Sequence, residues 1–192
     1  MNISFGKKIP LSQCQIQNKE TGNFEKATVY ELDCKDKNDI EEIRALGDSW
    51  HFNLGMAKDM DRKHHLNKYF DQENDSFFYV LEDENNEILG IAEIEEIETE
   101  VYDLRYLESH FSKFKKYIGQ ALLAVIGEEV LIRKGKSLVV NDAIDTAYDF
   151  YANTCGFEDK YGYYLKMDQE RINNFIEQTE DRTQALFKDL RA

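Results

Sequence analysis

Hydrophobic and polar positions along the chain follow two periods, which predict both strands and helices. Alternating runs, or runs rich in aromatic and β-branched residues, predict strands over residues 13–17, 24–32, 77–81, 88–97, 101–109 and 137–140. The polar segment 18–23 joins the first two runs and predicts an N-terminal hairpin. The turn at 83–86 predicts a second hairpin from the next two runs.

Apolar residues at helical spacing predict the helices. They indicate helices over residues 38–46, about 58–70, about 119–133 and 143–154, and one or two amphipathic helices in the tail. Residues 157–167 are Tyr-rich and predict a strand pair or a bent strand. Because a strand, a loop, a helix and a strand follow one another over residues 101–140, this region predicts a βαβ unit.

The length and composition fit one globular domain. The chain has 192 residues, and 42% of them are hydrophobic, which is enough for a core. We expect an α/β fold with a mixed, twisted central sheet flanked by helices. We divide it into an N-terminal hairpin extension (residues 1–26), a core (27–167) and a C-terminal helical extension (168–192).

Composition also excludes several classes of function. Lys and Arg number 24 against 38 Asp and Glu, and the net charge of −14 would repel a nucleic-acid backbone. No stretch reaches the roughly 20 apolar residues of a membrane span, and residues 1–15 lack the apolar core of a signal peptide. We therefore expect a cytoplasmic protein with neither nucleic-acid nor membrane partners. Three scattered cysteines and four scattered histidines do not predict a metal site.

Charge is distributed unevenly along the chain. Residues 71–103 contain thirteen acidic residues and no Lys or Arg, whereas residues 110–136 contain six Lys or Arg and two Glu. A basic loop at a helix start inside an acidic protein suits an anionic cofactor and a cationic substrate. A solvated strand face beside an ordinary helix would give the same charges.

The segment 104–124, LRYLESHFSKFKKYIGQALLA, carries the strongest chemical signal. An apolar strand runs through a Lys-rich turn into Gly119 and an apolar helix. Backbone amides at a helix start are unpaired donors, the helix dipole favours negative charge there, and a small residue lets phosphate oxygens approach. The pattern is typical of a pyrophosphate-binding turn, although a basic surface turn would share it.

This turn resembles the pyrophosphate loop of the GCN5-related N-acetyltransferase (GNAT) family, which reads Arg/Gln-x-x-Gly-x-Gly/Ala between a strand and a helix. Residues 116–121, KYIGQA, match that spacing with Lys116 in place of Arg or Gln. In a second alignment, YIGQALL stands where the family usually has GIGSALL, which puts Tyr117 at the family's first Gly. Both alignments leave the amides of residues 117–121 facing a pyrophosphate.

Downstream residues extend the resemblance over about residues 27–167. Residues 137–140 are similar to the family's fifth strand. Residues 146–157, TAYDFYANTCGF, are similar to its helix that ends in an aromatic pair, a short spacer and Gly-Phe. The spacer between Tyr151 and Gly156 is one residue longer than in the family, and Asp145 stands near where the family often has Asn.

The resemblance implies acetyl transfer from acetyl-CoA to an amine that attacks the thioester directly in a ternary complex. Tyr151 becomes the candidate acid that protonates the departing CoA thiolate, with Tyr148 in reserve; a core aromatic is the other interpretation of Tyr151. Glu108 is the candidate base, although a solvated strand carboxylate would look the same. Because Asp103 lies an odd number of residues away, we expect it on the opposite face of the strand.

The same resemblance assigns the cofactor to the turn and to the strand before it. We expect the main chain around Leu107 and Ser109 to hydrogen-bond the pantetheine arm, as an added strand would. The expected turn residues are Lys115, Lys116, Tyr117, Ile118, Gly119, Gln120 and Ala121.

The acceptor is expected to be a cationic small-molecule amine or a protein amine, because an acidic surface raises the local concentration of cations. The competing hypothesis is a GNAT-like domain that binds acyl-CoA or a protein partner without catalysis. The degenerate turn and the longer spacer motivate it. The apolar tail stripe at Ile172, Phe175 and Ile176 predicts packing against the body, with a homodimer contact as the alternative.

Overall fold

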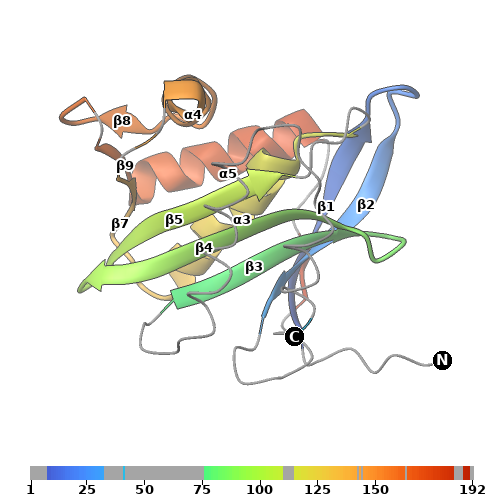
Figure 1. The fold of residues 1–192 in the computed structure, drawn as a ribbon, viewed down its shortest axis with the longest axis horizontal. Coiled ribbons are helices and arrows are strands. Elements are labelled where there is room, and N and C mark those ends of the chain that lie inside the picture. The colour runs from blue at the N-terminus through green and yellow to red at the C-terminus, as the bar shows by residue number, and fades with distance from the viewer. Residues whose placement is uncertain are drawn as a thin grey trace.

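One sheet organises the molecule. The computed structural model describes residues 8–32, 41, 76–109, 115–141, 143, 145–162, 164–183 and 188–190. Within these residues ten strands form a sheet of order β10-β1-β2-β3-β4-β5-β7-β9-β8, and β6 pairs with β1 (Figure 1). The two helices predicted over residues 38–46 and 58–70 lie, apart from Glu41, outside the described residues.

The strands and helices have the following bounds. The strands are β1 (Ile9–Asn18), β2 (Phe24–Glu31), β3 (Ser76–Asp83), β4 (Ile88–Glu98), β5 (Val101–Ser109), β6 (Lys115–Lys116), β7 (Ser137–Val140), β8 (Glu158–Asp159), β9 (Leu165–Asp168) and β10 (Lys188–Asp189). The helical segments are α3 (Ile118–Ile132), α4 (Asp145–Asp149), the π-helical segment η2 (Phe150–Thr154) and α5 (Gln169–Thr183). They confirm the expected mixed sheet, both hairpins and the βαβ unit.

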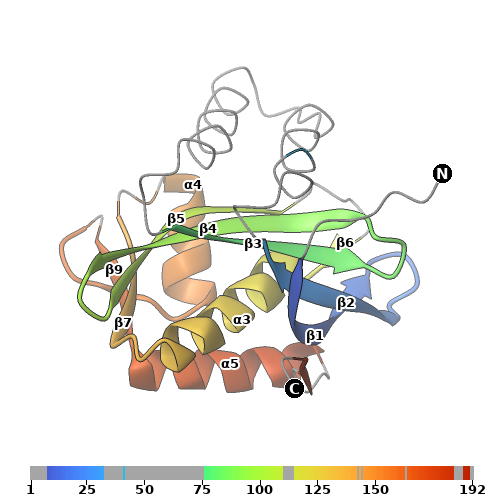
Figure 2. The ribbon, with the colours of Figure 1, turned by 90° about the horizontal axis from the view of Figure 1, so that it is seen from below.

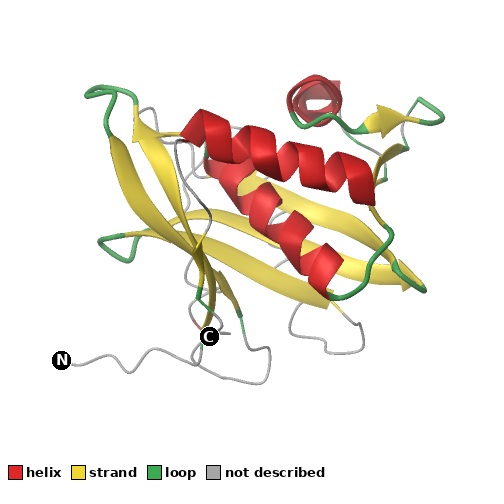
Figure 3. Ribbon diagram, turned by 180° about the vertical axis from the view of Figure 1, so that it is seen from behind, coloured by secondary structure: helices red, strands yellow, loops and turns green. Residues whose placement is uncertain are grey.

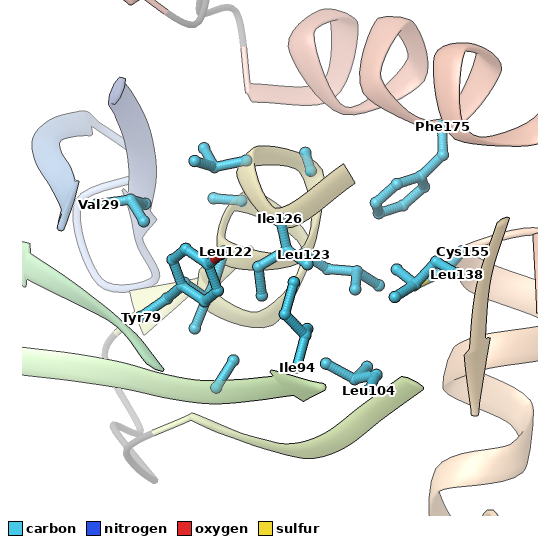
Figure 4. Close-up of a cluster of buried hydrophobic side chains, with 14 of the residues drawn as sticks. Val29, Tyr79, Ile94, Leu104, Leu122, Leu123, Ile126, Leu138, Cys155 and Phe175 are labelled. Atoms are coloured by element: carbon cyan, nitrogen blue, oxygen red, sulfur yellow. The ribbon is translucent and has the colours of Figure 1, made fainter. Parts of the chain in front are cut away.

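The core lies between the sheet and α3. Helix α3 lies between the sheet and α5, so that the sheet covers one side of α3 and α5 covers the other (Figures 2 and 3). Most residues of α3 are therefore buried. Its Leu122 and Ile126 pack with Tyr79 and Ile94 of the sheet (Figure 4). This double cover explains why α3 is apolar nearly all round rather than amphipathic.

The C-terminal tail packs against the body, as the apolar stripe predicts. Ile172 and Phe175 of α5 are buried, and a Cβ placed on Gly127 of α3 would lie 3.0 Å from Ile172 Cγ2. After this one helix, β10 pairs with β1, and Leu190 N–H donates to Leu11 O at 2.9 Å. The described part of the tail therefore forms one helix and an edge strand, whereas the sequence predicts one or two helices.

The region before β8 also differs from the prediction. A helix over residues 143–154 is expected, but α4 covers only Asp145–Asp149 and continues as the π-helical η2. The amide of Cys155 donates to Phe150 O at 3.0 Å, five residues back. A π-turn holds one residue more than an α-turn, so it accommodates the longer spacer before Gly156. None of the described helices is long and apolar enough to cross a bilayer.

Candidate functional site

Strand β5 parts from its parallel neighbour β7 after the first three residues of β5. The two strands pair only at Val101, Tyr102 and Asp103 of β5. Beyond Asp103, β5 keeps its pairing with β4 up to Ser109, but its edge towards β7 has no strand partner among the described residues. The main chain of Leu107 and Ser109 therefore lies on a strand with an open edge, as the pantetheine prediction requires.

A bulge in β5 corrects the expected orientation of Asp103 and Glu108. The register with β4 shifts between Tyr106, opposite Glu93, and Leu104, opposite Ile94, so that Arg105 is the extra residue. One extra residue reverses the alternation of side chains along the strand. Asp103 and Glu108 therefore point to the same face of the sheet, the face away from α3.

This face carries several carboxylates with defined partners. Glu108 accepts a hydrogen bond from the hydroxyl of Tyr106, and Glu93 accepts one from Ser76 Oγ at 3.0 Å. Arg105 Nε donates to Glu95 Oε2 at 2.7 Å, and its Nη1 lies 2.8 Å from Asp103 Oδ2. Burial opposes the charge of Arg105, but the hydrogen bond to Glu95 and the nearby carboxylates raise its pKa overall.

The turn into α3 has an unusual backbone. Tyr117, the residue before the helix, has φ 69° and ψ 7°, and it makes no side-chain hydrogen bond that caps the helix. This left-handed conformation costs a non-glycine residue energy and suits glycine. It therefore favours the alignment that puts Tyr117 at the family's first Gly. The amides of Ile118, Gly119 and Gln120 form the uncapped first turn of α3.

Two close approaches bring this turn next to β5 and η2. Gly90 of β4 stands opposite Ser109, and a Cβ there would lie 3.0 Å from Ile118 Cγ2. Gly119 faces η2, because a Cβ on it would lie 3.4 Å from Phe150 Cζ. The structure therefore brings together the end of β5, the first turn of α3 and the segment that carries Tyr151.

Tyr151 lies in η2, beside Phe150. Its side chain is buried, with its ring edge-on to Phe150 at 5.3 Å and to Phe157 at 5.6 Å. Burial, with a smaller effect of Cys155, raises the pKa of the Tyr151 phenol, so the phenol stays protonated near neutral pH. Tyr148, the reserve candidate, donates its hydroxyl to Asp159 Oδ2 at 2.7 Å.

The lysines of β6 differ in their surroundings. Lys115 forms an ion pair with Glu25 of β2, and its side chain is 16% exposed. Lys116 is exposed and Gln120 is half-buried, whereas Ala121 is fully buried on the core side of α3. Of the two lysines of β6, Lys116 is therefore the one whose charge is presented to solvent.

Sequence reasoning did not single out four residues that shape this site. Gly90 lets α3 approach the sheet closely, and Arg105 is the extra residue of the bulge. Phe150 lies against Gly119, and Glu25 forms the ion pair with Lys115. A glycine inside a strand pattern is a signal for close backbone approach, so Gly90 could have been found. The other three depend on register and long-range contacts, for which the sequence holds no local signal.

The arrangement of these elements is the GNAT acetyltransferase fold. Solved structures with this fold superpose on most of the chain at 10–17% sequence identity, and at that level the likeness concerns the fold. No family model matches the sequence, and no curated protein matches it.

Three solved structures illustrate the likeness. The spermidine N-acetyltransferase from Vibrio cholerae, in complex with CoA and spermine, has a TM-score of 0.52 at 15% identity, covering 77% of this chain and 98% of that one. The PaiA N-acetyltransferase from Thermoplasma acidophilum, in complex with coenzyme A, has 0.52 at 15%, covering 74% and 98%. An aminoglycoside 6′-acetyltransferase type Ii has 0.52 at 17%, covering 73% and 96%.

Proposed function

We propose that this protein transfers the acetyl group of acetyl-CoA to a primary amine of a cationic acceptor, by direct attack in a ternary complex. One observation carries the proposal: β5 parts from β7 next to the uncapped first turn of α3. Among the described residues this strand edge has no partner strand and these helix-start amides have no side-chain cap. Side by side, they can hold an extended amide-bearing arm that ends in phosphates.

The residues present fit acetyl-CoA, which supplies an acetyl group activated as a thioester. The amides of Ile118, Gly119 and Gln120 would bind the pyrophosphate, and exposed Lys116 would add positive charge. The main chain of Leu107 and Ser109 would pair with the pantetheine amides. Solved structures of this fold in complex with CoA support the same choice of cofactor.

The acidic face away from α3 supports a cationic acceptor. Glu93, Glu95, Asp103 and Glu108 all point to this face by the register of β4 and β5. Glu93 and Asp103 are buried in this face, whereas Glu95 and Glu108 are half-buried and would attract an ammonium group. Glu108 would take the proton that the amine must lose before or during its attack. Similar solved structures that act on spermidine and aminoglycosides support an amine acceptor.

Tyr151 would serve as the acid for the leaving thiolate. Burial keeps the Tyr151 phenol protonated, so it can donate a hydrogen bond to the sulfur as the C–S bond breaks. Because a thiol has an ordinary pKa near 8.5, below that of this phenol, the hydrogen bond stabilises the departing thiolate rather than transferring the proton completely. Its position next to Phe150, which contacts Gly119, puts the phenol in the segment that borders the cofactor turn.

The test is thiol release from acetyl-CoA in the presence of spermidine, kanamycin or a lysine-containing peptide. We expect steady thiol release with at least one amine and a strong loss of turnover in Glu108→Gln. The control Glu87→Gln should keep wild-type turnover, because Glu87 lies in the exposed turn before β4. Thermal stabilisation by CoA without turnover on any amine would support the non-catalytic CoA-binding alternative instead. The absence of both effects would refute CoA binding altogether.

A further inference from the structure

The N-terminal hairpin contacts the candidate cofactor turn directly. Strand β6, which leads into α3, pairs antiparallel with the end of β1, with Lys115 opposite Asn18 and Lys116 opposite Gln17. The hairpin β1–β2 is continuous with the central sheet through β3, so a rigid part of the molecule holds this turn (Figure 2).

Side chains reinforce this pairing on one face. Glu25 of β2 forms an ion pair with Lys115 and accepts a hydrogen bond from Asn18 Nδ2 at 2.9 Å. Asn18 Oδ1 in turn accepts the amides of Glu20 at 3.0 Å and Thr21 at 3.2 Å, which fixes the hairpin turn. A chain of contacts therefore runs from the hairpin turn through Asn18 and Glu25 to Lys115.

The turn needs such support because its backbone is strained. Tyr117 follows β6 directly and holds a left-handed conformation that costs a non-glycine residue energy. Strained residues persist where the surrounding structure fixes them on both sides. Here α3 fixes one side of Tyr117, and β6 on the hairpin fixes the other.

We propose that Glu25 is a positioning residue that braces the cofactor turn through Lys115, so that Lys115 supports the turn rather than binding phosphate. The inference rests on the proposed CoA site. Adjacent residues of a strand point to opposite faces, so Lys115 and Lys116 cannot both face one ligand. Lys115 is largely buried on Glu25, which leaves exposed Lys116 for the phosphates.

The two roles of Lys115 predict opposite effects of removing Glu25. If Lys115 is a brace, Glu25→Gln loosens the turn and weakens CoA binding. If Lys115 is a phosphate ligand, Glu25→Gln removes a competing anion and tightens CoA binding. Calorimetric titration with CoA, at low and moderate salt, distinguishes these cases by sign.

For a brace we expect Glu25→Gln and Lys115→Gln each to weaken CoA binding about three- to tenfold, the range for loss of a partly buried ion pair. The double variant should be no weaker than the poorer single variant, because both changes remove the same contact. Glu25→Asp should restore most of the affinity. Glu20→Gln, which removes the same charge at the exposed hairpin turn, should leave it unchanged.

Amide hydrogen exchange gives a second readout that needs no ligand. The amides of β6 and of Ala121, which donates to Tyr117 O, should exchange faster in Glu25→Gln than in the wild type or in Glu20→Gln, with an unchanged melting temperature excluding general destabilisation. Tighter CoA binding by Glu25→Gln, additive losses in the double variant, or unchanged affinity and exchange would each overturn the proposal. Failure of the wild type to bind CoA would refute the proposed function, and the role in cofactor binding with it.

Discussion

Removing Arg105 tests the bulge that orients the acidic face. Asp103 and Glu95 stand directly opposite each other on neighbouring strands, and like charges in that position repel. Asp103 is only 1% exposed, and neither of its carboxylate oxygens accepts a hydrogen bond within the described part of the chain. Among the described residues, Arg105 is the cation that compensates both carboxylates: its Nη1 lies 2.8 Å from Asp103, and its Nε donates to Glu95.

The size of the effect follows from the exposure of the three groups. Breaking a buried ion pair from one side costs about 3–5 kcal/mol, but the Arg105 side chain is 35% exposed, so solvent screening reduces this cost. We expect Arg105→Met to lower the free energy of unfolding by about 2 kcal/mol. For a chain of this length that corresponds to a fall of about 4–8 °C in melting temperature.

Urea unfolding measures this loss, with two further variants as controls. Lys160→Met breaks an exposed pair with Glu158, whose side chain is 42% exposed, and should cost no more than about 0.5 kcal/mol. Asp103→Asn in the Arg105→Met background should recover most of the stability, because it removes one of the two repelling charges. A loss in Arg105→Met no larger than that of Lys160→Met, or no recovery in the double variant, would refute this account of the bulge.

Three further predictions concern the turn, the acid and the buried thiol. Gly119→Ala should stabilise the protein by about 0.5–1 kcal/mol in urea unfolding, since its Cβ meets Phe150 at an ordinary 3.4 Å, while weakening CoA binding in calorimetry. Tyr151→Phe should lower kcat more than KM, and the wild-type pH–rate profile should show no loss from this phenol below pH 10, because its pKa is raised. Burial, aided by Glu128, raises the pKa of Cys14 from 9.0 to about 12. Only the unfolded state then releases this proton between those pH values, so stability should fall there by about 1.4 kcal/mol per pH unit from this group, and Cys14→Ala should flatten the measured slope by one proton.

Much of the fold could be predicted from the sequence because its signals are local. Strand β5 and strand β7 have the predicted bounds, and α3 begins and ends within one residue of its prediction. Alternation, helical spacing and turn residues are each defined over a few neighbouring positions, so they can be recognised without knowledge of tertiary contacts. The placement of the candidate cofactor turn between β5 and α3 follows from the same local order.

The orientation of the candidate base could not be predicted in the same way. Counting residues from Asp103 to Glu108 predicts opposite faces, and the bulge at Arg105 reverses the result. A bulge shifts the phase of the alternation, but Tyr106 and Leu107 are both apolar, so the shift cannot be located without the partner strand. The role of Lys115 is hidden for a related reason, since its partner Glu25 lies 90 residues away in the sequence.

The local irregularities around the site argue against an ordinary surface turn. Four non-glycine residues in the described part of the chain have positive φ: Asn86, Glu100, Tyr117 and Lys134. Asn86 and Glu100 lie in hairpin turns and Lys134 follows a helix, where such conformations are common. Tyr117 alone among these four leads into a helix. It stands between β6 and α3, and Gly119 of α3 lies against Phe150 of η2. The strain at Tyr117 therefore supports the proposal that this turn presents the first amides of α3 to a ligand.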